Sequence, residues 1–165
     1  MSKGKIAATG LLMLVVGCGD GPTAPVVVPP ESPRSSAGTF MHDGALVEVE
    51  VEVLQPYLEP DDALTIGVTV RNLSEQEASF TFADGCAFFY SIRALDGTSR
   101  SPGWFCTFGV VTIDLPAGDT LSETFQWDGR AYSDEGVKER VRPGLYEIRG
   151  WFARWTGPVL VGVRD

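Results

Sequence analysis

Apolar and polar residues alternate along most of the chain between residue 45 and the C-terminus. The clearest case is Leu46–Leu54, in which four valines alternate with three glutamates. A period of two predicts a β-strand that buries one side and leaves the other in water. Similar patterns occupy residues 64–71, 78–82, 86–92, 110–115, 121–127, 146–152 and 159–163, and no stretch of ten residues has a helical period. The pattern predicts an all-β chain that folds as an antiparallel β-sandwich of about seven to nine strands.

Turn-forming residues separate the predicted strands. The chain contains 19 glycines and 11 prolines, which suits a fold with many chain reversals. Turns are expected at residues 56–62, 72–75, 83–85, 96–97, 116–118 and 143–144. With 165 residues, of which 44% are hydrophobic, the chain is long enough for one domain with its own core, which we assign to residues 45–165.

Residues 1–17 have the layout of an export signal. Lys3 and Lys5 precede the apolar run Ile6–Val16, which is shorter than the roughly 20 residues that span a bilayer. The run ends in Val15-Val16-Gly17-Cys18, which resembles the lipobox of a bacterial lipoprotein signal. The resemblance implies cleavage before Cys18 and attachment of fatty-acyl chains such as palmitate to that cysteine. The alternative is an ordinary secretory signal that contains a cysteine.

Residues 18–44 are expected to be a tether between the lipid and the domain. Five prolines lie between Gly19 and Ala37, and proline at this density favours an extended, semi-rigid linker. The apolar stretch Val26–Val28 is read as linker, with a short edge strand as the alternative. By analogy with lipoprotein sorting, a glycine after Cys18 favours the outer membrane; the sequence does not indicate the periplasmic or the surface side.

Short motifs follow one another along the predicted sandwich. They are Leu64-Thr65-Ile66 with Val68 and Val70-Arg71-Asn72, Phe80–Gly85, Ile92–Gly97, Leu115–Gly118, Trp127, and Pro143–Tyr146 with Gly150. Their order and spacing over residues 64–152 resemble the intracellular proteinase inhibitor domain of Bacillus, the BsuPI domain. The resemblance implies an immunoglobulin-like fold and the inhibition of a protease. The chain departs from that family in its export signal and in its two cysteines, Cys86 and Cys106.

Once Cys18 is lipidated, Cys86 and Cys106 are the remaining cysteines. An exported chain folds where disulfides form and persist, so we predict a bond between them. The alternatives are a buried pair of free thiols and half of a metal site. His42, the single histidine, precedes the predicted domain and is poorly placed to complete such a site.

No motif in the chain indicates an enzyme. The sequence lacks the zinc-protease, nucleophile-elbow and phosphate-loop patterns, and His42 is poorly placed for a catalytic triad. The acidic pairs Asp61-Asp62 and Asp134-Glu135 fit solvated turns, although paired carboxylates can also serve glycosidases. The glutamates of Leu46–Leu54 could face a cation, but Ca²⁺ requires oxygens that converge from a loop. We expect no catalytic residue, no metal and no cofactor.

The segment Asp128–Arg142 joins two predicted strands and is long for such a connection. It carries Arg130, Tyr132, Lys138, Arg140 and Arg142 in an otherwise acidic chain. A long loop on a rigid scaffold often carries recognition, so these five residues form the candidate partner-binding loop; the alternative is an exposed connection without function. The aromatic residues Trp104, Phe105 and Phe108 are a second candidate surface, with packing against the disulfide as the alternative.

The formal net charge of −9 argues against nucleic acid or an anionic lipid surface as the partner, because both require clustered lysine and arginine. The sequence therefore predicts a membrane-anchored lipoprotein of the cell envelope that acts as a protein-binding module. Its expected partner is a protease or another envelope protein. The alternative is a structural or accessory surface module without inhibitory activity. Nothing in the sequence indicates an oligomeric state.

Overall fold

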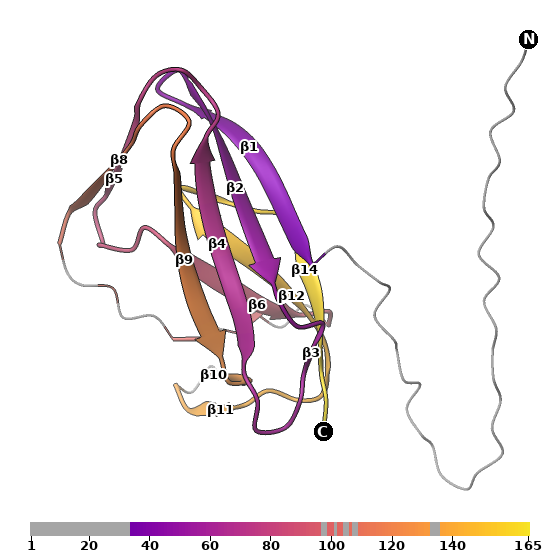
Figure 1. The fold of residues 1–165 in the computed structure, drawn as a ribbon. Coiled ribbons are helices and arrows are strands. Elements are labelled where there is room, and N and C mark those ends of the chain that lie inside the picture. Colours follow the sequence, from indigo (N-terminus) through magenta and orange to yellow (C-terminus); the bar gives the residue numbers. More distant parts are fainter. Residues whose placement is uncertain (1–33, 97–98, 101, 104–105, 107–108, 133–135) are drawn as a thin grey trace, which may run out of the picture.

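The computed structural model describes residues 34–96, 99–100, 102–103, 106, 109–132 and 136–165 (Figure 1). The predicted signal peptide, Cys18 and the tether up to residue 33 lie outside these residues. The described residues contain fourteen strands and no helix, and nine of the strands have five residues or more. Among the described residues there is consequently no helical segment with the length and hydrophobicity needed to cross a bilayer. The all-β prediction is confirmed.

Two sheets form the sandwich. The first has the order β1-β2-β4-β9 and is antiparallel throughout. Its strands are β1 (Ser35–His42), β2 (Ala45–Val53), β4 (Leu64–Asn72) and β9 (Thr120–Trp127). The second sheet has the order β3-β14-β12-β6-β7, and β13 also pairs with β12. Its strands are β3 (Tyr57–Leu58), β14 (Val159–Val163), β12 (Gly144–Phe152), β6 (Phe89–Ala94), β7 (Ser99–Arg100) and β13 (Arg154–Trp155).

Two ribbons lie outside these sheets. One pairs β5 (Ala78–Phe82) with β8 (Val111–Leu115), and the other pairs β10 (Arg130–Tyr132) with β11 (Lys138–Arg140). Figure 1 shows the β5–β8 ribbon at one side of the sandwich and the β10–β11 ribbon at the end where β9 finishes. Both ribbons therefore extend from the two-sheet sandwich.

The connectivity is immunoglobulin-like. The orders β2-β4-β9 and β14-β12-β6 correspond to the A-B-E and G-F-C strands of that fold. After β2, the chain leaves the first sheet and forms β3, which pairs in parallel with β14 of the second sheet. The Tyr146 hydroxyl donates a hydrogen bond of 2.7 Å to the Arg142 carbonyl, four residues upstream. This bond resembles the tyrosine corner that closes many β-sandwiches.

The alternation seen in the sequence determines which side chains reach the core. All four valines of β2 are at most 2% exposed, and their counterparts in β4 and β12 are also buried. Gly150 of β12 lies where the two sheets approach each other. A Cβ atom there would lie 3.0 Å from side-chain atoms of both Val51 and Val68. The glycine therefore allows β12 to pack closely on β2 and β4.

An aromatic cluster attaches the β5–β8 ribbon to the sandwich. Phe80 of β5 packs edge-on against Phe152 of β12, with ring centroids 4.8 Å apart. It also contacts Phe40 of β1 at 6.4 Å and stacks with His42 at 4.2 Å. Aromatic pairs at these separations add stabilisation beyond the area that they bury.

The boundary expected between tether and domain differs from the structure. The sequence predicts a tether over residues 18–44, but Ser35–His42 form β1, which pairs with β2 over its whole length. The backbone amides of β2 would otherwise form an open edge, and β1 satisfies them. Polar and small residues dominate β1, so it lacks the strict alternation by which the other long strands can be identified.

Candidate functional site

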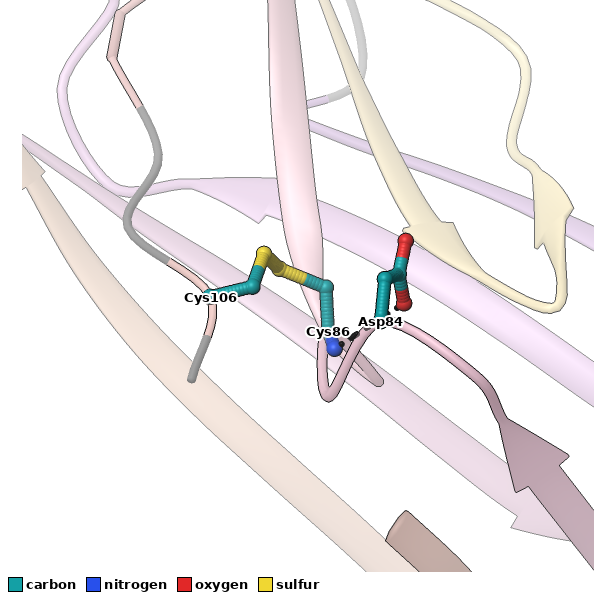
Figure 2. The surroundings of a disulfide bond; sticks show 3 residues. All are labelled: Asp84, Cys86 and Cys106. Carbon is teal, nitrogen blue, oxygen red and sulfur yellow. Dashed lines mark hydrogen bonds between the residues drawn. A yellow bond between two sulfur atoms is a disulfide. The ribbon is translucent and has the colours of Figure 1, made fainter. Parts of the chain in front are cut away.

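Cys86 and Cys106 form a disulfide, which is the pairing that the sequence predicts (Figure 2). Their Cα atoms are 5.2 Å apart, within the usual range for this bond. Cys86 follows the turn at Asp84-Gly85, where its backbone amide donates a hydrogen bond of 3.2 Å to the Asp84 carboxylate. The bond joins the start of the segment that enters β6 to residue 106. Of the aromatic residues expected near it, Trp104, Phe105 and Phe108 lie outside the described residues.

The candidate loop Asp128–Arg142 is a hairpin rather than an irregular connection. Arg130 pairs with Arg140, Ala131 with Glu139, and Tyr132 with Lys138. Gly129 has a φ of 75° and begins the reversal from β9 into β10. Two hydrogen bonds hold the base of the hairpin: the Arg130 amide donates to the Asp128 carboxylate at 3.0 Å, and the Val141 amide donates to the Gly129 carbonyl at 2.8 Å.

The hairpin is fastened to the core of the sandwich. The indole Nε1 of Trp127 donates a hydrogen bond of 2.9 Å to the Arg130 carbonyl, and Trp127 itself is buried. Ala131 and Val141 are also buried. A Cβ atom at Gly129 would collide with Cδ2 of Leu58, so β3 packs directly against the hairpin base. Buried residues of the core, with Trp127 among them, thus hold the hairpin in position.

The sequence-predicted residues gather on one surface. Because side chains alternate across a strand, the cross-strand pairs Arg130–Arg140 and Tyr132–Lys138 lie on the same face of the hairpin. The three cationic side chains are exposed, and Tyr132 is half-buried. Arg142 follows β11, is also exposed, and lines a shallow depression of about 150 Å³ together with the hairpin strand β11. All five predicted residues are therefore close to one another, with Arg142 at the margin.

Among the described residues, two of these cations have exposed partners. The Lys138 ammonium lies 3.8 Å from the Asp128 carboxylate, and both side chains are about half exposed. The Arg140 guanidinium donates a hydrogen bond of 3.4 Å to the Glu59 carbonyl. Exposed ion pairs of this kind contribute little energy, so the cations are available to a partner at small cost.

Tyr132 links the hairpin to the segment that carries Cys106. Gly103 has a φ of 83°, and a Cβ atom at this position would collide with the ring of Tyr132. The ring therefore packs directly against the backbone of residue 103, and this close approach requires glycine. The predicted loop and the disulfide-bearing segment thus meet at this point.

Two residue types that often carry chemistry in proteins, histidine and tyrosine, have structural surroundings at His42 and Tyr90. His42 stacks on Phe80, and its Nε2 lies 2.8 Å from the Ser79 carbonyl, so the ring has a structural position. No cluster of metal-ligating side chains occurs within the described ranges. Burial raises the pKa of the Tyr90 phenol far above its ordinary value, and the negative charge of Asp128 adds to the effect. The Tyr90 phenol is therefore protonated and neutral at neutral pH.

A second surface was not predicted from the sequence. Phe89, Trp151 and Trp155 cluster on the outer face of the second sheet, with centroids 5.1–5.2 Å apart. One feature of the sequence could have indicated this surface. Trp151 lies on the outward-facing side of β12, at alternate positions with Glu147 and Arg149. A single exposed aromatic residue is ordinary, but a group of them on the outer face of a sheet is a candidate binding surface.

No family model matches the chain, and no curated protein matches it. Some solved structures are similar in part. A β-glucosidase from Listeria innocua in complex with glucose has a TM-score of 0.49 and 15% identity, over 73% of this chain and 16% of the glucosidase. A β-glucosidase from Erythrobacter marinus has a TM-score of 0.46 and 15% identity, over 79% of this chain and 16% of the enzyme.

An alkylpurine DNA glycosylase from Pseudomonas fluorescens has a TM-score of 0.46 and 11% identity, over 80% of this chain and 31% of the glycosylase. The chain therefore spans less than a third of the length of any of these three proteins. Similarity at this level assigns neither an activity nor a substrate to the chain.

Proposed function

We propose that the chain is a lipid-anchored protein of the bacterial cell envelope, and that its partners are proteins that dock on the β10–β11 hairpin. The lipobox at residues 15–18 and the export signal before it support the anchor. A lipid on Cys18 would hold the sandwich near the membrane through the proline-rich tether, since two or three acyl chains anchor firmly where one is marginal.

One observation carries the binding function. Three exposed cations and a half-buried tyrosine share one face of a hairpin that is fastened to the core, in a chain with a formal charge of −9. Arginine and tyrosine are enriched among the residues that dominate binding energy at protein interfaces. A rigid support lowers the entropy lost on binding, and local positive charge favours a partner with an acidic surface.

The resemblance to the BsuPI domain suggests a protease as the class of partner. A hairpin whose two ends are held by the scaffold keeps its shape on binding, which suits an inhibitor. The alternative is an accessory surface module that docks on another envelope protein and inhibits nothing. Both functions use the same hairpin, and an inhibition assay separates them.

The test compares the full-length protein with a variant in which Arg130, Lys138 and Arg140 are each changed to glutamate. A control variant reverses the exposed arginines Arg71 and Arg154, which lie on other strands. We expect capture of a partner from envelope extracts to weaken at least about tenfold in the hairpin variant alone, and to weaken with added salt. Equal capture by both variants would contradict the proposal.

Two further measurements separate the parts of the proposal. Inhibition of serine proteases at micromolar protein supports the inhibitor, whereas hairpin-dependent capture without inhibition supports the accessory module. Mass spectrometry of the purified mature protein tests the anchor. An unmodified Cys18 or an intact Met1 would refute lipidation while leaving the binding function open.

A further inference from the structure

The outer face of the second sheet carries an aromatic wall beside a charged floor. Trp151 of β12 stacks near Phe89 of β6, with centroids 5.2 Å apart, and Trp155 of β13 meets both rings edge-on. Trp155 is 44% exposed. Leaving this much indole in water forfeits the stabilisation that its burial would provide, so the position calls for an explanation.

The chain around Trp155 is built to hold it there. Ala153 has a φ of 53°, a conformation that non-glycine residues adopt at a cost, and it reverses the chain within a single residue between β12 and β13. Thr156, only 3% exposed, then ties the returning segment to Gly150. The Thr156 amide donates to the Gly150 carbonyl at 2.9 Å, and the Gly150 amide donates to the Thr156 hydroxyl at 3.0 Å. These buried bonds fix the indole over the sheet.

A shallow depression of about 180 Å³ adjoins the aromatic wall. Its lining consists of Trp155 on one side and, along β6 and β12, Ser91, Arg93, Glu147 and Arg149. The Arg149 guanidinium donates a hydrogen bond of 3.2 Å to the Glu147 carboxylate, which orients both planar groups. Except for the indole, every group in this lining is polar or charged.

We propose that this depression binds a saccharide. One face of a pyranose ring presents polarised C–H bonds, which suit the negatively charged face of an indole. The rim of the ring carries hydroxyl groups that both donate and accept. Glu147 can accept from a pair of hydroxyls, while Arg93, Arg149 and Ser91 can donate to them.

The lining favours a saccharide over a protein side chain. The buried centre of a protein interface is usually apolar and depleted of charge, whereas this depression has one apolar wall and four polar residues. Small polar ligands are held in this way, by one aromatic contact for affinity and several placed polar groups for orientation. The site lies on the second sheet and does not depend on the function proposed for the hairpin.

The test uses isothermal titration calorimetry of the full-length protein with chitotetraose, cellotetraose and tetragalacturonate. We expect at least one of them to bind with a dissociation constant of about 1 mM or tighter. Trp155→Ala should weaken this binding at least about tenfold, and Trp155→Phe should weaken it less because an aromatic face is kept. Glu147→Gln should also weaken it, since the amide can accept fewer hydroxyls.

The matched control is Leu121→Ala, which removes an exposed apolar side chain from the first sheet and should leave the affinity unchanged. Thermal unfolding of each variant shows whether it is folded. If Trp155→Ala does not fold, the comparison of Glu147→Gln with Leu121→Ala decides. The proposal is overturned if none of the three saccharides binds, if binding is equal in Glu147→Gln and the control, or if the face proves to be covered by a protein partner.

Discussion

Asn72 shows how one polar residue can hold several segments together. It ends β4 and is 1% exposed. Its Nδ2 donates to the carbonyls of Gln76, Leu115 and Pro116 at 2.7–3.1 Å, and its Oδ1 accepts from the Ser74 amide and hydroxyl. A turn, the end of β4 and the end of β8 therefore depend on a single carboxamide.

Replacement of Asn72 by alanine should lower the free energy of unfolding by about 3 kcal/mol, because buried carbonyls and an amide lose their partners together. Urea unfolding measures the change. Leu73→Ala is the control, since Leu73 is exposed and its truncation should change stability by less than about 0.5 kcal/mol. Similar values for the two variants would show that the carboxamide does not hold these segments.

The raised pKa of Tyr90 predicts that the folded protein loses stability at alkaline pH. Burial raises the pKa of its phenol in the folded state, whereas an unfolded tyrosine ionises near pH ~10. Above that pH the unfolded chain binds fewer protons than the folded chain. The free energy of unfolding should therefore be constant with respect to this group below pH ~9 and fall above pH ~10, by at most ~1.4 kcal/mol per pH unit.

Urea unfolding between pH 8 and pH 11, at roughly half-unit steps, measures this effect. Tyr90→Phe removes the ionising group and should flatten the decline by the share that belongs to Tyr90. An identical alkaline slope in the wild type and the variant would mean that Tyr90 does not remain protonated in the folded protein.

At the scale of elements, the two ribbons outside the sheets differ in how they are attached. Aromatic rings hold the β5–β8 ribbon, with Phe80 at the centre. Backbone hydrogen bonds and the Trp127 indole hold the β10–β11 hairpin. The disulfide adds a covalent link between these regions, because Cys86 follows β5 and residue 103, close to Cys106, contacts Tyr132 of β10.

The disulfide between Cys86 and Cys106 should contribute roughly 3 kcal/mol to stability, the loop-closure value for a separation of this size. Urea unfolding with and without reductant measures it. The variant with serine at both positions should match the reduced wild type and should not respond to reductant. Two free thiols in a titration of the native protein would contradict the bond.

At the scale of the whole molecule, β1 completes the sandwich. It covers the edge of β2, and its residues Phe40 and His42 contact Phe80 of the β5–β8 ribbon. The first sheet, the ribbon and β12 thereby share one aromatic cluster. The domain consequently includes residues that look like linker in the sequence.

A chain that begins at residue 34 should therefore fold as a cooperative unit, and a chain that begins at residue 45 should be less stable by at least about 2 kcal/mol. Phe40, which is partly buried against the core, accounts for part of this value, and the backbone pairing of β1 with β2 accounts for the rest. The shorter chain should also associate through the exposed edge of β2, which size-exclusion chromatography detects. Equal stability and a monomeric state for both chains would place β1 outside the cooperative domain.

Strand positions were predictable because burial acts through the local period. The inward residues of β2, β4, β5 and β12 follow from alternation alone, and each of these strands packs as expected. Leu121 shows the limit of this signal: alternation places it on the same face of β9 as Phe125 and Trp127, but it is 39% exposed. The second sheet does not cover Leu121 at that end of β9. Alternation in the sequence cannot predict this, because it depends on where the other sheet ends.

By itself, the sequence determined the all-β class and the inward face of most long strands, because alternation and turns are local properties. It also pointed to five residues within 128–142, whose role as a binding surface stays a prediction. Tertiary structure alone decided that β1 joins the first sheet and that residues 128–142 form a paired hairpin. It also decided that Trp155 folds back onto Trp151. These features depend on contacts between residues far apart in the chain, or on a single strained turn at Ala153, and neither leaves a periodic signal in the sequence.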